Sequence, residues 1–449
     1  MKKNVYIVHC VDTEGPLEES LDATFDRIFE LTGEKIDVSE KNLQLIQDGL
    51  IDLNGNESFA KKAFSRDLLN YMNNWGKIDK MLNDIQSNNF RNQLKDSAGN
   101  GWIYNWFCLD HVDYQKNPRN RALGYHKIFD YYNKRLKQEQ NLKDSIHFHY
   151  HPRNFRNEGH LVGTHWLNNG NYIYQILSRR IIDRMWFPRV NRPGFHVTRS
   201  DSNWFLEQFI PFDYANQSLY PGYKFNNPYE YRFGDWRNAP YSSTPYHPSH
   251  DDYQKPGNCR RWIARCMNVG TRHSLINQND VDLSFETANK CKPSILSFTN
   301  HDFRDMRPDV EFVNKMIKKS SIKFPDVKFY FSEASQAFRL ALNLKEERAC
   351  FFNISFKKNK SGVYMVIESE IASFGPQPFF ALKTKNGNYY HDNLLIEQNH
   401  HQWIYFFDEH TFKLEEIEFI GIASNNNYGT TSVVRINPET KNTETIEYV

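Results

Sequence analysis

The stretch Asp144-Ser-Ile-His-Phe-His-Tyr-His-Pro152 places three histidines at alternate positions directly before a proline. Successive side chains of an extended strand point to opposite faces, so we expect His147, His149 and His151 to project the same way. Imidazole is the commonest protein ligand of divalent metals, and a proline ends a strand because it lacks a backbone N–H. The pattern predicts a metal site at a strand end. The alternative is a histidine-rich edge strand that faces solvent.

Two other apolar runs end in polar side chains that fit such a site. Val5–Val11 is a near-continuous apolar run, as in strands buried on both faces of a parallel sheet, and it leads into Asp12 and Glu14. Ser294–Asn300 is a similar run and leads into His301. Parallel α/β folds carry their chemistry at the carboxyl ends of strands, so we expect these side chains there. As an alternative, Asp12 caps the next helix.

Strands alternate with helical patterns over the first three quarters of the chain. Further strand-like runs at 102–109 and 327–331 are separated by segments with helical spacing of apolar residues. This alternation argues for a parallel α/β barrel. We expect the barrel to occupy residues 1–345, with a polar helical insertion at about 40–95 and an irregular loop at about 219–270.

The segment at about 219–270 is rich in Tyr, Pro, Asn and Asp, a composition too irregular for a buried core. We interpret it as a loop that faces the substrate. Aromatic rings have apolar faces that stack on the C–H faces of sugars as well as fill cores. Asp235, Trp236 and Tyr246 are therefore predicted sugar contacts.

The spacing of apolar residues changes from about residue 346. Phe352, Ile354 and Phe356 alternate with other residues, as in strands with one buried face. The pair Asn386-Gly387 between two such runs is typical of a tight hairpin turn. Repeated short runs of this kind predict an all-β sandwich domain over residues 346–449.

The bulk composition excludes several classes of protein. The 449-residue chain carries 56 Lys and Arg against 54 Asp and Glu, so its net charge gives no reason to expect a nucleic acid or an acidic membrane as partner. Its six cysteines lack the paired spacing of a disulfide framework or of a cysteine zinc site.

The sequence shows no pattern of a membrane-spanning or targeting segment. No run of about 18 consecutive apolar residues exists, so we expect no membrane span. Met1–Cys10 leads into acidic residues rather than a small-residue cleavage site, and we interpret it as a first strand and not a signal peptide. These observations predict a soluble, cytoplasmic protein, and they give no indication of its oligomeric state.

Four segments follow one another in the order of a known set of motifs. They are Val11-Asp-Thr-Glu-Gly-Pro16, His147-Phe-His-Tyr-His-Pro152, Asn191-Arg-Pro-Gly194 and Ser297-Phe-Thr-Asn-His-Asp302. On these segments, residues 5–342 resemble the polysaccharide deacetylases of carbohydrate esterase family 4, whereas the C-terminal part shows no specific family pattern. The resemblance implies a distorted (β/α)7 barrel of the TIM-like class. It also implies that the barrel binds one divalent metal, usually zinc, and hydrolyses an N-acetyl or O-acetyl group of a sugar.

The resemblance assigns roles to individual residues. By motif position Asp12 is the base, His301 is the acid, and Arg192 pairs with the base and keeps it ionised. Hydrolysis of an amide needs these partners and an activated water. Where the family has two adjacent aspartates this chain has Asp12-Thr-Glu14, so the carboxylate ligand of the metal is either Glu14 or Asp12.

The histidine segment also departs from the family pattern. The family has two histidines four residues apart, and here a third histidine stands between them. Keeping that spacing makes His147 and His151 the ligands. Matching the residues that lead into the segment makes His149 and His151 the ligands, and we favour this second pair.

Three functions are compatible with these residues. The leading hypothesis is a metal-dependent hydrolase that removes acetyl groups from a sugar, with surface-polysaccharide biosynthesis as its setting. The second is a glycoside hydrolase on a related barrel, which needs two carboxylates roughly 5–9.5 Å apart. The third is a non-catalytic glycan-binding module whose altered motifs no longer hold a metal. All three predict a carbohydrate as the partner.

Overall fold

The structure is a computed structural model that describes residues 2–138, 143–158, 161–167, 171–223, 234–271, 273–360 and 362–449. The chain divides into two compact units. The first unit comprises Met1–Ile146, Arg156–Leu161 and Cys266–Ser332. The second unit comprises His147–Phe155, Val162–Arg265 and Glu333–Val449.

Seven parallel strands close into a barrel, because β1 to β7 follow one another in the sheet order β2-β3-β4-β5-β6-β7-β1-β8 and β2 also pairs with β1. The eighth strand pairs in parallel with the first residues of β1. The strands are β1 (Asn4–Thr13), β2 (Tyr104–Cys108), β3 (Ser145–Tyr150), β4 (Val190–Pro193), β5 (Phe212–Asn216), β6 (Trp262–Asn268), β7 (Ile295–His301) and β8 (Lys328–Phe331). The predicted parallel α/β barrel is confirmed.

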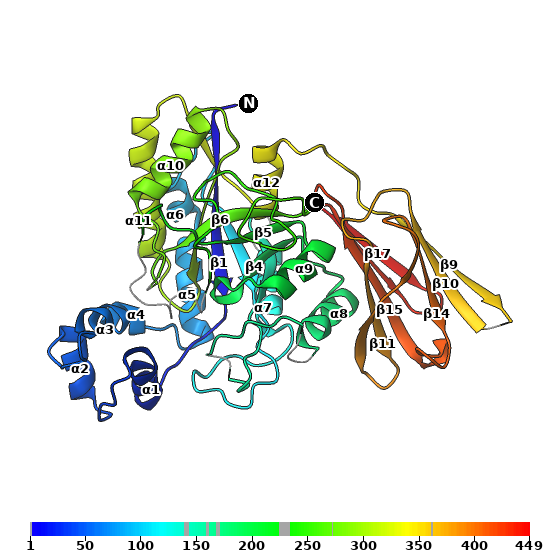
Figure 1. Ribbon diagram of the computed structural model, residues 1–449, viewed down its shortest axis with the longest axis horizontal. Coiled ribbons are helices and arrows are strands. Elements are labelled where there is room, and N and C mark those ends of the chain that lie inside the picture. The colour runs from blue at the N-terminus through cyan, green and yellow to red at the C-terminus, as the bar shows by residue number, and fades with distance from the viewer. Residues whose placement is uncertain are drawn as a thin grey trace. The chain divides into compact units, whose positions relative to one another are not determined.

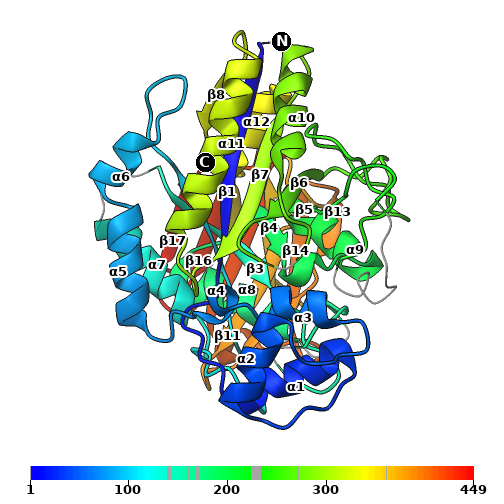
Figure 2. The same ribbon diagram turned by 90° about the vertical axis from the view of Figure 1, so that its left-hand side faces the viewer.

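In the first unit, β1 lies between β2 and β7 and is almost entirely buried, as its apolar run predicts. Helix α10 (Gln278–Asn289) packs on β1 and β7 and against α11 (Arg307–Lys323), and Figure 2 shows these helices beside the two strands. Asp12 stands opposite His301 in the register of β1 and β7. The topology therefore brings these two polar residues to neighbouring strand ends.

Short helices fill most of the chain between β1 and β2, and α7 (Lys127–Gln138) follows β2. They are α1 (Leu21–Thr32), α2 (Glu40–Asp48), α3 (Glu57–Ala63), α4 (Arg66–Leu69), α5 (Trp75–Ile85) and α6 (Asn88–Gln93). Apolar residues of the first three helices share a small core that includes Phe25, Ile46 and Phe64. Figure 2 shows α1, α2 and α3 together beyond the end of β1.

The second unit carries α8 (Tyr172–Arg184), η1 (Gly194–His196), α9 (Ser200–Phe209), α12 (Ala334–Leu342) and two antiparallel sheets. One sheet has the order β13-β14-β10-β9 and the other β12-β11-β15-β16-β17. Their elements are β9 (Phe352–Asn359), β10 (Gly362–Ser369), β11 (Phe379–Thr384), β12 (Tyr389–Asp392), β13 (Leu395–Gln398), β14 (Gln402–Phe407), η3 (Leu414–Glu416), β15 (Ile417–Asn425), β16 (Thr431–Ile436) and β17 (Thr443–Tyr448).

The two C-terminal sheets share one hydrophobic core, and Figure 1 shows them as two layers. Trp403 and Ile367 from one sheet and Ile420 from the other are fully buried in it. The predicted hairpin is present, since β11 and β12 pair across a turn in which Gly387 has a φ of +84°. The C-terminal region is therefore an all-β part, as its alternating sequence predicts.

The C-terminal sheets pack on α8 within the second unit. Tyr389 donates its hydroxyl hydrogen bond to Asp183 at 2.7 Å, and Arg435 donates to the backbone carbonyl of Ile182 at 2.8 Å. Gly421 permits close approach, because a Cβ there would lie 2.6 Å from the side chain of Ile181. This packing ties the β-rich region to one helix of the barrel.

Several elements were not predicted from the sequence. Strand β6 lies inside the segment at about 219–270, for which an irregular loop was predicted. Residues 224–233 of that segment lie outside the described part of the chain. Arg265 interrupts the apolar run of β6, although its guanidinium is buried and donates to the carbonyl of Ser218 at 2.7 Å. Similarly, the buried Ser178 and Arg180 interrupt the apolar stripe of α8. These buried polar residues are the reason that neither β6 nor α8 was predicted.

The described residues include no helix with both the length and the hydropathy that crossing a bilayer requires.

Candidate metal centre

The carboxyl ends of β1 and β7 bring two carboxylates to one imidazole. Nε2 of His301 lies 3.7 Å from Oδ2 of Asp12 and 3.7 Å from Oε1 of Glu14. Both carboxylates are buried, with Asp12 2% and Glu14 4% exposed. These distances exceed that of a direct hydrogen bond. The three groups are of the types that transfer protons in hydrolysis.

A buried aspartate holds the turn that follows β1. The Asp302 carboxylate accepts hydrogen bonds from the backbone N–H of Glu14 at 2.9 Å, from that of Gly15 at 3.0 Å and from the Tyr132 hydroxyl at 2.9 Å. Burial raises the pKa of Asp302 to about 7, although these hydrogen bonds oppose the rise. Gly15 has a φ of +70°, which side chains rarely allow. Asp302 therefore fixes the backbone from which the Glu14 side chain starts.

The Glu14 side chain has a cationic partner of its own. Nη2 of Arg121 lies 2.6 Å from Oε2 of Glu14. Nε2 of His111 lies 3.1 Å from the Glu14 backbone carbonyl, so that nitrogen carries the proton and donates. Arg121 was not identified from the sequence. Asp302 was noted only as the last residue of the fourth segment, because only the folded chain brings it to the backbone of Glu14.

His149 and His151 face each other at the end of β3. Nδ1 of His149 lies 2.6 Å from the backbone carbonyl of Arg192, its register partner on β4. A carbonyl only accepts, so Nδ1 carries the proton and Nε2 of a neutral His149 presents a lone pair. Nε2 of His151 lies 2.9 Å from Nε2 of His149. Two imidazole nitrogens this close need a proton or a cation between them.

The turn after β4 is shaped around the His151 ring. A Cβ on Gly194 would lie 2.2 Å from Cδ2 of His151, so only glycine fits there. The Phe195 ring packs on the His151 ring with centroids 4.8 Å apart. Phe195 and His196 both have positive φ, 51° and 53°, and the Trp236 indole donates to the His196 carbonyl at 2.9 Å. Strained backbone of this kind is commonly found at functional sites.

Arg192 contributes more than its backbone carbonyl. Its buried guanidinium lies against the His196 ring, with Nη1 3.1 Å from Nδ1 and Nη2 2.9 Å from Nε2. The predicted pairing of Arg192 with Asp12 stays a prediction. His196 was not identified from the sequence, where it reads as an isolated histidine in a turn.

His147 has a different partner from the other two histidines. Its Nε2 lies 3.2 Å from Oε1 of Glu333, which also receives Arg189 at 3.4 Å. Burial opposes ionisation of Glu333, but Arg189 and His147 together hold the pKa of Glu333 well below its usual range. Burial lowers the pKa of His147, so we take its imidazole as neutral, with Nε2–H donated to Glu333.

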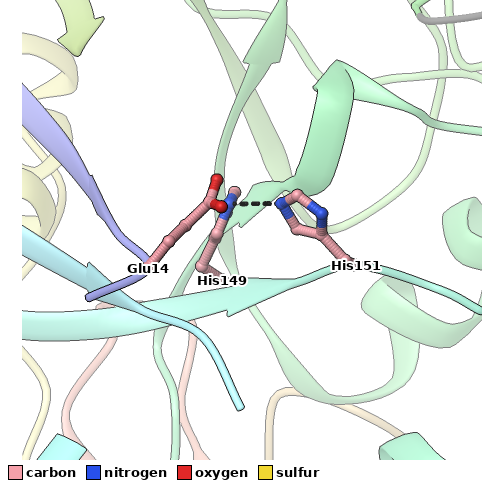
Figure 3. Close-up of side chains that lie close together, drawn as sticks. All are labelled: Glu14, His149 and His151. Carbon is pink, nitrogen blue, oxygen red and sulfur yellow. Dashed lines mark hydrogen bonds between the residues drawn. The ribbon is translucent and has the colours of Figure 1, made fainter. Parts of the chain in front are cut away.

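Glu14, His149 and His151 form a group that could hold a metal ion. Each offers one ligand atom, and these atoms lie within 4.8 Å of one another. Figure 3 shows the three side chains converging, with the hydrogen bond between the two imidazoles dashed. Asp12 and His147, the other predicted ligands, are not members of this group as the described residues place them. The structure therefore shows one group of side chains that could hold a metal ion, and nothing identifies the metal.

The three predicted sugar contacts lie in the loop before β6. Trp236 and Tyr246 are only 3% and 8% exposed and pack together with Tyr253 and Ile263. Asp235 pairs with Arg237 at 2.8 Å. The ring faces of Trp236 and Tyr246 are therefore used in packing, which argues against stacking on a sugar, and sugar contact stays a prediction.

Comparison with known proteins yields no identification of this chain. No protein-family model, curated protein or solved structure matches it. The resemblance to polysaccharide deacetylases therefore rests on the four sequence segments alone.

Proposed function

We propose that this chain is a metal-dependent hydrolase that removes acetyl groups, in the first place N-acetyl groups, from a sugar. The observation that supports the proposal most is the group of Glu14, His149 and His151, with Asp12 and His301 beside Glu14 on neighbouring strand ends. The proposal also rests on the order of the four sequence segments.

The residues present fit a zinc ion. Two imidazole nitrogens and one carboxylate oxygen are the ligand set of catalytic zinc sites that keep a fourth position for water or substrate. His149 donates its other ring proton to the Arg192 carbonyl, the second contact that metal-bound histidines usually make. Zinc bound there would polarise the acetyl carbonyl and lower the pKa of water from 15.7 towards ~7–9.

The other residues would handle protons and position. Asp12 takes the proton of the attacking water, and His301 gives a proton to the leaving amine, each worth about 10²–10⁴-fold in rate. Asp302 holds Glu14 in place through the backbone of the turn. Arg192 and the glycine after Pro193 hold the two histidines. His147 takes no part, since it is engaged with Glu333.

The metal is tested first. Purified protein is stripped with a chelator, reloaded with zinc and assayed for bound metal. We expect one zinc per chain in the native protein, and a loss of at least about tenfold in affinity in His151→Ala and in Glu14→Gln. His410→Ala, which removes an exposed imidazole from the C-terminal region, is the matched control and should bind zinc normally. A native protein that holds no zinc would favour a glycan-binding module instead.

The reaction is tested by acetate release from a panel of N-acetylated and O-acetylated sugars. We expect Asp12→Asn and His301→Ala to lose about 10²–10⁴-fold in kcat while they retain zinc. Release of reducing ends without release of acetate would mean that the chain is a glycoside hydrolase. Zinc binding with neither product would contradict the proposal.

A further inference from the structure

Four guanidinium groups of the first unit form a partly buried network, and one of them pairs with Glu14. We call them the arginine cluster: Arg27, Arg119, Arg121 and Arg304. None of these arginines has a role in the proposed hydrolysis. Two carboxylates, those of Glu14 and Glu19, pair directly with the cluster.

Glu19 lies between two members of the cluster. It accepts two hydrogen bonds from Arg27, each 2.9 Å long, and Nε of Arg119 lies 4.0 Å from it. The Tyr71 hydroxyl also donates to this carboxylate, at 3.1 Å. One negative charge is therefore shared by two guanidinium groups.

Aromatic rings join the other two members to this pair. The guanidinium groups of Arg121 and Arg304 both lie 4.9 Å from the centroid of Phe303. Arg304 also lies 5.3 Å from the ring of Tyr71 and donates to the backbone carbonyl of Leu68 at 3.1 Å. Arg121 is the member that pairs with Glu14.

Positive charge exceeds negative charge within this network. Among the described residues, the four arginines pair directly with two carboxylates, those of Glu14 and Glu19, and the charge of Asp309 also acts on Arg304. The side chains of Arg27, Arg119 and Arg121 are only 7%, 17% and 11% exposed. Burial lowers the pKa of Arg119; Glu19 opposes this, and the charges of Arg27 and Arg121 add to it. Withdrawing unbalanced charge from water costs free energy, so an added anion would stabilise the cluster.

Two buried guanidinium nitrogens of the cluster have no hydrogen-bond acceptor among the described residues. Nη1 of Arg27 and Nη1 of Arg121 meet no hydrogen-bond partner in the part of the chain that the structure describes. A guanidinium offers its N–H groups in a planar fork that fits the oxygens of a phosphate or a carboxylate. The unmet donors and the surplus charge therefore point to the same kind of ligand.

We propose that the arginine cluster binds an oxyanion, either a phosphate or a carboxylate, that the acetylated sugar carries. This inference rests on the proposed function, because the molecule that carries the anion is the sugar substrate of that reaction. The Arg121–Glu14 pair places the cluster next to the candidate metal ligand Glu14. It narrows the substrate from any acetylated sugar to an acidic one. Sugar phosphates and nucleotide-linked sugars carry a phosphate, and uronic acids carry a carboxylate.

The first test is calorimetric titration with inorganic phosphate at constant ionic strength. We expect Arg119→Gln to bind about tenfold more weakly than the native protein, Arg119→Lys to recover part of the loss, and His151→Ala to bind as the native protein does. Arg307→Gln is the control, because Arg307 is an exposed arginine that pairs with Asp84 and Glu311 elsewhere in the same unit. Phosphate binding that is lost in His151→Ala but kept in Arg119→Gln would overturn the proposal, as would equal binding by all variants.

The second test compares acetate release from an acetylated sugar phosphate, an acetylated uronic acid and a neutral acetylated sugar. We expect Arg119→Gln to raise KM about tenfold for one acidic substrate, with kcat and the neutral substrate little changed. Which acidic substrate responds identifies the anion. If the native protein releases no acetate but binds phosphate through Arg119, the proposed function fails, and the proposal that the arginine cluster binds an oxyanion is supported. If it releases acetate only from neutral sugars and binds no phosphate, the cluster proposal alone fails.

Discussion

The barrel and the C-terminal β region differ in what they bury. Strands and strand ends of the barrel bury charged and polar side chains, such as His9, His147, Asp213 and Arg261. The described part of the C-terminal region surrounds its hydrophobic core with buried polar side chains that are uncharged, such as Asn425 and Thr431. Burial of polar groups costs free energy unless every group is paired, so a barrel that retains them uses them for position or chemistry. We therefore expect barrel substitutions to change activity and stability together, and C-terminal substitutions to change stability alone.

The largest effect is expected at the ion pair of Asp213 with Arg261. Both side chains are fully buried and lie 2.8 Å apart, and Asp213 also accepts from Asn191. Asp213→Ala leaves a buried guanidinium without its carboxylate, and we expect a loss of about 3–5 kcal/mol in the free energy of unfolding, measured by urea denaturation. Replacing both partners by apolar residues should cost less. A loss below about 1 kcal/mol in Asp213→Ala would mean that this pair does not support the barrel.

The next effect concerns the apolar core of the C-terminal sheets. Ile367 is fully buried there, so Ile367→Ala should lower the free energy of unfolding by about 2–5 kcal/mol through lost burial and a cavity. At temperatures where the variant stays folded, kcat and KM for acetate release should equal those of the native protein. A fall in kcat without unfolding would break the distinction between the two regions.

A pH dependence follows from His9 in the barrel. Trp102 donates its indole N–H to Nδ1 of His9, and Nε2 of His9 donates to Asn300. Burial lowers the pKa of His9 from 6.5 to about 3. Because the unfolded chain binds this proton more readily, stability is fully present above about pH 6.5 and is lost as the pH falls towards 3. Between pH 6.5 and 4.5 the loss amounts to roughly 2–3 kcal/mol.

The measurement for His9 is the free energy of unfolding from pH 4.5 to 8, for the native protein and for His9→Gln. We expect a shallower pH dependence in the variant across the acid half of that range. Parallel curves would contradict this account, because they would mean that the pKa of His9 does not change on folding.

The smallest effect is expected on the surface. Lys290 pairs with Glu286 one turn earlier on α10, and both side chains are more than half exposed. Lys290→Ala should change the free energy of unfolding by about 0.3–0.5 kcal/mol, close to the limit of denaturation measurements. A change of several kcal/mol would indicate that surface pairs, and not buried ones, dominate the stability of this unit.

How much of the fold could be predicted depended on whether each element carries a clean apolar pattern. The run Val5–Val11 identified β1, and alternation after residue 346 identified the β-rich region. Strand β6 and helix α8 escaped prediction because Arg265 and Arg180 are buried in them. Such an arginine looks like a surface residue until its partner is known, and the partner lies far away in the sequence.

The candidate site divides in the same way. Polar residues at strand ends, such as Glu14, His149 and His301, could be found from the sequence because a parallel sheet gathers its strand ends. The residues that hold these side chains in place could not be found from the sequence. Asp302 is recognised only by the backbone N–H groups that it accepts from, and Glu333 only by its contact with His147. Spacing along the chain carries no information about such contacts.

We propose that Glu14, His149 and His151 together hold one divalent cation. An anomalous difference map, measured at the zinc absorption edge on crystals of the zinc-loaded protein, tests it most directly. We predict one strong peak, at about 2.0–2.2 Å from two imidazole nitrogens and from an oxygen of Glu14. A peak bound to other side chains, or full zinc loading with no peak at these three, would contradict the claim.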